Sequence, residues 1–353
     1  MPKRKRKTKS TPSLRKTNTR NSENKINNTA PTNTDGSNLD AEIIEKKLEL
    51  IDDDTFSLWK RGYQRQITYN FCEDRENIFF LDTLGLVCLP DTTENLLSEA
   101  KYRTFCFTSK MDVYEIYERD IDGERFDRKR ERYSWVMKCL WWAERMYYYT
   151  PISTFLVLVN CKNNIHMSRE ELSCVFNDIK TVLGPDCFHL FPEKDAFVFD
   201  RSFGDKEKQL LSELLKRQGR KGFYIPPVKV IDDFYREAVL ITSKPYQDML
   251  SFLTQAMKID QRISLALIVA LWKKLSKDGM MSLDSFFDWF FNFLLISPCG
   301  RELINHLINL YFEVCKVTNM RDNRGFAPIN LYGYGEKALK NPISPPTNES
   351  LLQ

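Results

Sequence analysis

The chain has 353 residues, enough for about two domains that can each bury a core. Its 42% apolar and 28% charged content is typical of a folded soluble protein. The net charge of +4 conceals an asymmetry, because residues 1–20 contain nine basic residues and no acid, which leaves 43 basic against 48 acidic residues in the rest. A basic tail on a mildly acidic body excludes a wholly basic protein that coats nucleic acid.

The nine cysteines are scattered, their number is odd, and no CxxC pair occurs. This pattern predicts free thiols in a reducing compartment. An apolar signal region near the N-terminus and long apolar runs are both absent from the sequence. We therefore expect an intracellular protein without a membrane segment.

Residues 1–38 are predicted to be a disordered basic arm, because they are rich in Ser, Thr and Asn and have almost nothing to bury. The arm begins with five clustered cations: Lys3, Arg4, Lys5, Arg6 and Lys7. Such a cluster is typical of a nuclear import signal and can also attract nucleic-acid phosphates without regard to base sequence. The expected localisation is nuclear.

Residues 39–218 are predicted to form a mixed α/β domain that begins with a short helix over 39–51. An aromatic and basic patch follows, formed by Trp59, Lys60, Arg61, Tyr63 and Arg65. It could stack bases and hold phosphates, or it could be a half-buried element whose cations reach out to water. Strand-like runs are expected at 78–81, 86–89 and 103–108, and a short helix at 95–102.

A long helix is predicted over about 124–148, with Tyr133, Val136, Leu140 and Trp141 on one face. Its first half mixes basic and acidic residues, which favours a solvated, salt-bridged surface over a stripe that reads DNA.

A small βαβ-like unit is predicted within residues 152–200. The continuous apolar run 154–159 resembles a buried strand. Ser168 followed by Glu171 predicts a capped helix start, and Gly184-Pro185 predicts its end. Residues 195–199 then return as a strand.

After a helix over 205–217, the Gly/Pro-rich stretch 219–227 is the best domain boundary. Residues 225–320 are predicted to be an all-helical bundle, with helices at 246–257, 260–276, 282–297 and 300–316. Residues 286–296 are apolar on every side, which predicts a central, fully packed helix. A loose tail is expected over 321–353. The fold class is therefore α+β.

No residue pattern predicts a catalytic group, a metal or another cofactor. Cys161, His166, Cys174, Cys187 and His189 lack the paired ligand spacing of a zinc site. Phosphate-binding glycine motifs are absent from the sequence. A two-metal site could be assembled only from isolated acids, namely Glu193, Asp195, Asp232 and Asp233.

The aromatic content is high for a chain without an obvious active site, and large aromatic side chains are favoured anchors at interfaces. We expect at least one protein-binding groove in the C-terminal helices, with these partner-binding residues: Trp272, Trp289, Phe290, Phe293, Leu307 and Tyr311.

The same helices resemble the SMN-interacting protein family of spliceosomal snRNP assembly factors. Three stretches carry the resemblance: Leu271-Trp272-Lys273-Lys274, Asp288-Trp289-Phe290-Phe291 with Leu294-Leu295, and Leu303-Ile304 with Leu307 and Cys315. The resemblance implies a non-catalytic adaptor whose C-terminal bundle grips a helix of a partner protein.

The sequence thus favours a nuclear, non-enzymatic adaptor or assembly subunit of a nucleoprotein complex, which binds a partner helix through its C-terminal helices. One alternative is a direct RNA- or DNA-binding subunit that uses the arm and the patch at 59–69. The other is a divergent metal-dependent nuclease or transferase.

Overall fold

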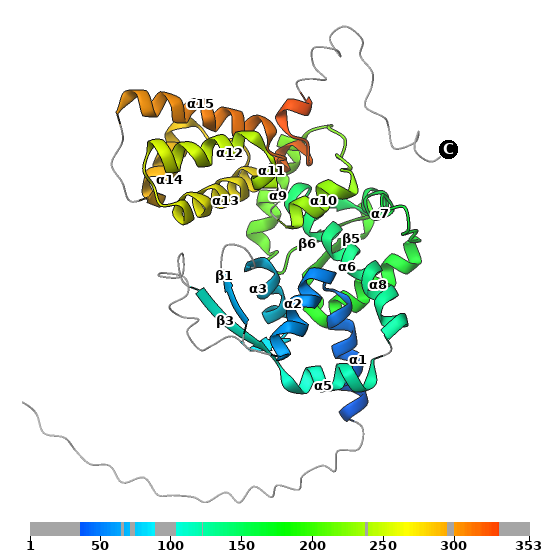
Figure 1. The fold of residues 1–353 in the computed structure, drawn as a ribbon. Coiled ribbons are helices and arrows are strands. Elements are labelled where there is room, and N and C mark those ends of the chain that lie inside the picture. The colour runs from blue at the N-terminus through cyan, green and yellow to red at the C-terminus, as the bar shows by residue number, and fades with distance from the viewer. Residues whose placement is uncertain are drawn as a thin grey trace, which may run out of the picture.

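The computed structural model describes residues 36–64, 67–70, 75–88, 104–121, 123–236, 239–294 and 300–331. Within these ranges the chain is a mostly helical α+β fold with two small antiparallel sheets (Figure 1). One contiguous core of buried apolar side chains reaches from Ile44 to Met320. The predicted mixture of helices and strands is confirmed, whereas residues 1–35 of the predicted arm lie outside the described residues.

Helix α6 (Gly123–Met146) is the centre of this core, as 12 of its residues are buried and it is therefore surrounded by other elements. Helices α1 (Gly36–Glu49), α7 (Ile152–Val159), α10 (Val228–Tyr235) and α13 (Gln261–Asp278) pack against it. The long helix expected from the sequence is confirmed.

The prediction that residues 286–296 form the central, fully packed helix is wrong. Helix α14 (Leu283–Leu294) buries only Phe286 and Phe290 completely, and its other aromatic side chains are half-buried. The helix is amphipathic because Asp284, Asp288 and Asn292 occupy its exposed side.

The N-terminal sheet has the strand order β1 (Ile67–Asn70), β3 (Thr104–Ser109), β2 (Val87–Cys88), and both pairings are antiparallel. In the chain, its strands are preceded by helix α2 (Asp53–Gln64), interrupted by α3 (Arg75–Thr83) and followed by α5 (Met111–Asp120). The strands expected near 87 and 104 are confirmed. The strand expected at 78–81 is wrong, because these residues lie in α3, and the helix expected at 95–102 lies outside the described residues.

The second sheet has the order β4 (Tyr149–Pro151), β6 (Ala196–Phe199), β5 (Phe188–Phe191) and is also antiparallel. The predicted βαβ-like unit is wrong, because the apolar run at 154–159 belongs to helix α7. Its buried residues Thr154, Phe155, Leu158 and Val159 have helical spacing. Helix α8 (Arg169–Leu183) begins at the predicted Ser168–Glu171 capping box and ends at Gly184.

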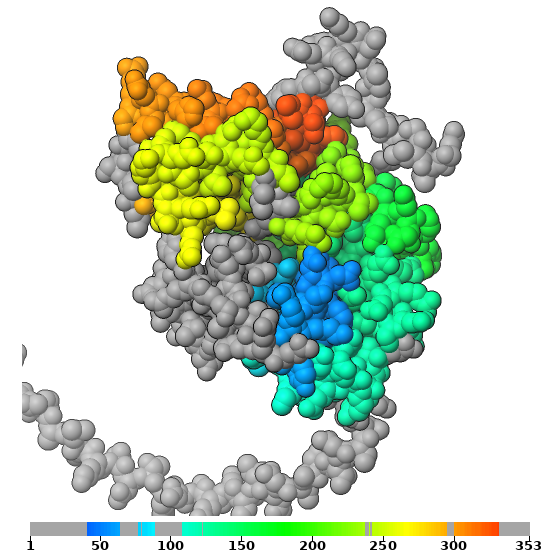
Figure 2. Space-filling view, viewed as in Figure 1, coloured from blue at the N-terminus to red at the C-terminus, as the bar shows by residue number. Residues whose placement is uncertain are grey.

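Helix α9 (Asp205–Gln218) precedes a segment without regular structure over 219–227. From residue 228 onward the described residues form α10, α11 (Val239–Thr242), α12 (Lys244–Ser251) with a π-helical turn (Phe252–Ala256), α13, α14 and α15 (Arg301–Val317). The four helices predicted there are confirmed at their described residues. Figure 2 shows α12, α13 and α15, in yellow to orange, at one end of the molecule, away from α1. Within the described ranges, every helix is too short or too polar to cross a bilayer.

The loose tail predicted from residue 321 is wrong for residues 321–327, which pack between α6 and α9. Arg321 is buried, and its guanidinium donates to the carbonyl oxygens of Glu144 (2.8 Å) and Arg145 (3.0 Å) at the end of α6. Gln218 of α9 donates to the carbonyl oxygen of Arg321 at 2.9 Å. This closing segment therefore joins three parts of the chain that are far apart in sequence.

Candidate partner-binding surfaces

Four of the six predicted partner-binding residues are core residues and not surface anchors. Trp272, Phe290, Leu307 and Tyr311 are at most 3% exposed. The Tyr311 ring stacks on Phe286 with centroids 4.0 Å apart, and its hydroxyl donates to the Met281 carbonyl oxygen at 2.8 Å. A partner cannot touch these side chains unless the helices separate, so their assignment as contact residues is wrong.

The other two, Trp289 and Phe293, are half-buried on α14, and their ring centroids are 5.8 Å apart. Within the described residues, neither of them lines a groove, and their assignment as contact residues stays a prediction. A groove that the sequence did not predict lies on another side of α14, between this helix and the start of α15. The groove has a volume of about 340 Å³ and is lined by Phe287, Asp288, Phe291, Asn292 and Ile304.

This α14–α15 groove combines an apolar wall with a charge. The rings of Phe287 and Phe291 are stacked at 5.9 Å with an interplanar angle of 17°, which gives a continuous aromatic wall. Asp288 is exposed at its edge. Aromatic rings are favoured anchors at protein interfaces, and a carboxylate at the edge of the groove attracts a basic group.

The predicted nucleic-acid patch does not form a stacking surface. Trp59 is fully buried, and its indole N–H donates to the Leu86 carbonyl oxygen at 3.2 Å. The Lys60 ammonium lies over the Tyr117 ring at 4.8 Å, so this cation is engaged within the protein. Tyr63 is 38% exposed, but one of its faces stacks on Tyr114 at 3.7 Å.

The assignment of Trp59 as a base-stacking residue is therefore wrong. Arg61 is exposed on α2 and remains accessible to a ligand. Arg65 and the five cations at 3–7 lie outside the described residues.

A second groove, which the sequence did not predict, lies between α6 and α8. It has a volume of about 380 Å³, and four cations of α6 line it together with a mostly apolar floor from both helices: Arg125, Arg128, Lys129, Arg132, Tyr133, Met167, Glu171, Cys174 and Val175. The four cations are spaced i, i+3, i+4, i+7, so they share one face of α6.

The acids of the same helix segment point elsewhere. Asp127 pairs with Arg130 at 3.4 Å, and Glu131 binds the Lys162 ammonium at 3.1 Å and the Asn164 amide at 2.6 Å. The mixed charges in the sequence are thus separated in space. The predicted salt-bridged surface is confirmed for this part of α6, and on the side that faces α8 the pair of Arg132 and Glu171 at 3.0 Å belongs to it.

The groove is coupled to a buried carboxylate behind it. Lys129 approaches Glu49 of α1 at 2.9 Å, and the Glu49 side chain is completely buried. Removal from water raises the pKa of Glu49 to about 7, although the Lys129 ammonium acts in the opposite direction. Lys129 is thus held by a group that titrates near neutral pH.

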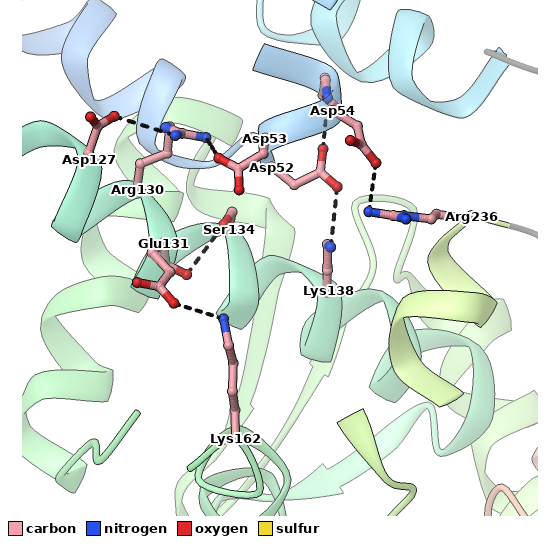
Figure 3. A network of polar contacts seen from close by, with 11 residues as sticks. Asp52, Asp53, Asp54, Asp127, Arg130, Glu131, Ser134, Lys138, Lys162 and Arg236 are labelled. Atoms are coloured by element: carbon pink, nitrogen blue, oxygen red, sulfur yellow. Dashed lines mark hydrogen bonds and ion pairs between the residues drawn. The ribbon is translucent and has the colours of Figure 1, made fainter. Parts of the chain in front are cut away.

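A network of ion pairs on another side of α6 joins three helices (Figure 3). Asp52 caps α2 by accepting from the Thr55 N–H at 2.9 Å, and its carboxylate also lies 3.2 Å from the Lys138 ammonium. Lys138 reaches Asp232 of α10 at 2.9 Å. Each of these acids has a cationic partner, so this cluster fixes α2 and α10 on α6.

The residues considered for metal chemistry do not come together. Asp232 pairs with Lys138, and Asp233 pairs with Lys229 at 2.7 Å. Among the cysteines and histidines, Cys187 is buried, while the His189 ring bonds to the Asp200 carbonyl oxygen at 3.0 Å. Within the described ranges, no three His, Cys, Asp or Glu side chains are grouped to hold a metal ion.

No protein-family model, curated protein or solved structure matches this chain.

Proposed function

We propose that the chain is a non-enzymatic adaptor or assembly subunit of a nuclear nucleoprotein complex, whose C-terminal helices form an all-helical bundle that binds a helix of a partner protein. The observation that carries the proposal is the α14–α15 groove with its stacked, half-exposed Phe287 and Phe291. Aromatic side chains at the surface of a groove are the usual anchors of helix recognition.

The charge of the groove indicates which kind of helix it would bind. Asp288 lines it and Asp284 is exposed one helical turn earlier, so both carboxylates lie along the same side of α14. We expect an amphipathic helix that places aliphatic side chains against the two phenylalanines and Lys or Arg beside the carboxylates. An acidic helix would be repelled.

The basic arm supports the nuclear part of the proposal. Five cations at positions 3–7 suit an import signal, and they would add weak attraction to phosphates of the assembled complex. The resemblance of residues 271–315 to SMN-interacting proteins implies the same adaptor role. Deletion of residues 3–7 from a fluorescent fusion of the full chain should shift it from the nucleus to the cytoplasm.

Site-specific photo-crosslinking of the full chain in nuclear extract tests the groove. A photoreactive phenylalanine analogue at Phe291 should capture a partner peptide with helical spacing of apolar and basic residues, identified by mass spectrometry. The same analogue at Phe312 is the matched control, because Phe312 is an exposed aromatic of α15 that does not line the groove.

Phe287→Glu should abolish the crosslink from position 291, since a carboxylate in the apolar wall would have to be desolvated on binding. Equal capture from positions 291 and 312, or capture that survives Phe287→Glu, would remove the basis for the proposal.

A further inference from the structure

The α6–α8 groove has features that the stability of the fold does not require. Its four cations, Arg125, Arg128, Lys129 and Arg132, are gathered within about 10 Å along one helix face. Arg125 lies in the first turn of α6, where the helix dipole is positive, and the other three cations follow in the next two turns. Like charges at this spacing repel one another, and an anion bound among them would relieve the repulsion.

Two of the guanidinium groups can bind a ligand without giving up a strong interaction within the protein. Arg128 is exposed and has no ion pair within the described part of the chain. Arg132 pairs with Glu171 at 3.0 Å, but both side chains are more than 40% exposed. Such an exposed pair contributes little to stability, so Arg132 can exchange this carboxylate for a stronger anion.

We propose that the α6–α8 groove binds a phosphorylated side chain on a peptide segment of a partner protein. A phosphate dianion has three acceptor oxygens and can engage the guanidinium groups of Arg128 and Arg132 together, which are four residues apart on the helix. The apolar floor, with Met167 and Val175, would take a neighbouring side chain of the same peptide. This site is separate from the α14–α15 groove.

The surroundings favour a compact anion over a nucleic acid. Asp127 and Glu131 are exposed on the adjacent side of α6, and Glu170 is exposed in the first turn of α8. They would repel the next phosphates of a polyanionic backbone. The groove also lacks an exposed ring for base stacking, because its aromatic residue, Tyr133, is only 9% exposed. The chain's own basic arm is excluded as an occupant by its charge.

Fluorescence anisotropy with the full chain tests this proposal. The probe is a labelled degenerate peptide mixture with a fixed central phosphoserine, compared with the same mixture carrying serine. We expect measurable binding of the phosphorylated mixture only. Arg128→Ala and Arg132→Ala should each weaken it about 10-fold, the loss expected for one charge-assisted hydrogen bond.

Arg128→Lys keeps the charge but loses the bidentate geometry, so its affinity should fall between those of the wild type and Arg128→Ala. Arg220→Ala is the matched control, because Arg220 is an exposed arginine after α9 that does not line the groove. It should bind as the wild type does. Unchanged melting temperatures of the four variants would show that they are folded.

The exposed Cys174 thiol in the groove gives a second readout. The phosphorylated mixture should slow its alkylation, measured by mass spectrometry, while alkylation of the exposed Cys88 stays unchanged. Equal affinity for the serine mixture, or unaltered Cys174 alkylation at saturation, would overturn the proposal. So would tighter binding of a single-stranded oligonucleotide or a free nucleotide that is lost in the same arginine variants.

Discussion

The completely buried Glu49 makes the stability of the protein depend on pH in a direction opposite to that of most carboxylates. Its pKa is raised by desolvation from 4.5 to about 7, and Lys129 is its ion-pair partner at 2.9 Å. Between these pH values the folded chain holds a proton that the unfolded chain has released. The contribution of Glu49 to the stability must therefore fall as the pH rises from 4.5 to 7.

The size of this effect follows from the shift. At 1.36 kcal/mol for each pKa unit, a carboxyl group that titrates near 7 in the fold and 4.5 in the unfolded chain loses about 3 kcal/mol of folding free energy over this range. Glu49→Gln keeps the shape and does not ionise. The variant should therefore become more stable relative to the wild type by about this amount as the pH rises, and the difference should level off once the pH exceeds the pKa of Glu49 in the fold.

Urea denaturation followed by the fluorescence of the buried tryptophans, at a series of pH values, measures the difference. Glu213→Gln on the exposed side of α9 is the control, since this substitution removes a carboxylate that is in contact with water and not buried. If Lys129 instead dominates, the Glu49→Gln difference will change with the opposite sign, and the reasoning about desolvation is refuted.

Three further predictions concern stability. Trp59→Ala should cost about 3–5 kcal/mol in urea denaturation, because a fully buried indole is removed from the core; unchanged stability would restore Trp59 as a surface ligand-binding residue. Arg321→Ala should cost about 2–3 kcal/mol and speed proteolysis near residue 147, since the Glu144 carbonyl oxygen loses its charged donor. A wild-type cleavage pattern would contradict this. Asp52→Ala should lower the unfolding free energy by about 1–2 kcal/mol by removing the cap of α2 and one partner of Lys138, whereas an unchanged thermal midpoint would show that the network in Figure 3 contributes little.

Local signals in the sequence located many helix boundaries, because their physics is local. The Ser168–Glu171 capping box and Gly184 lie where the predicted helix begins and ends. The strand predicted for residues 154–159 is wrong because a short apolar segment fits a buried strand and a buried helix equally well. Only its packing beside α6 and β4 distinguishes the two, and a single sequence does not contain that information.

The candidate surfaces, too, could be predicted from the sequence only in part. The sequence directed attention to the aromatic C-terminal helices, but burial depends on tertiary contacts, so Phe290 proved internal while Phe291 lines the groove. The cations of α6 were visible at i, i+3, i+4, i+7, which could have separated them from Asp127 and Glu131. That this face opens onto α8 required the fold.

The position of Arg321 has a consequence for biosynthesis. The carbonyl groups of Glu144 and Arg145 receive their donor from a residue about half the chain length downstream. During translation, the end of α6 therefore lacks this donor until the 176 residues after Arg145 have been synthesised. A transcript that terminates before this arginine would release a chain whose central helix stays incompletely bonded, and such a product is a natural target for quality-control proteases.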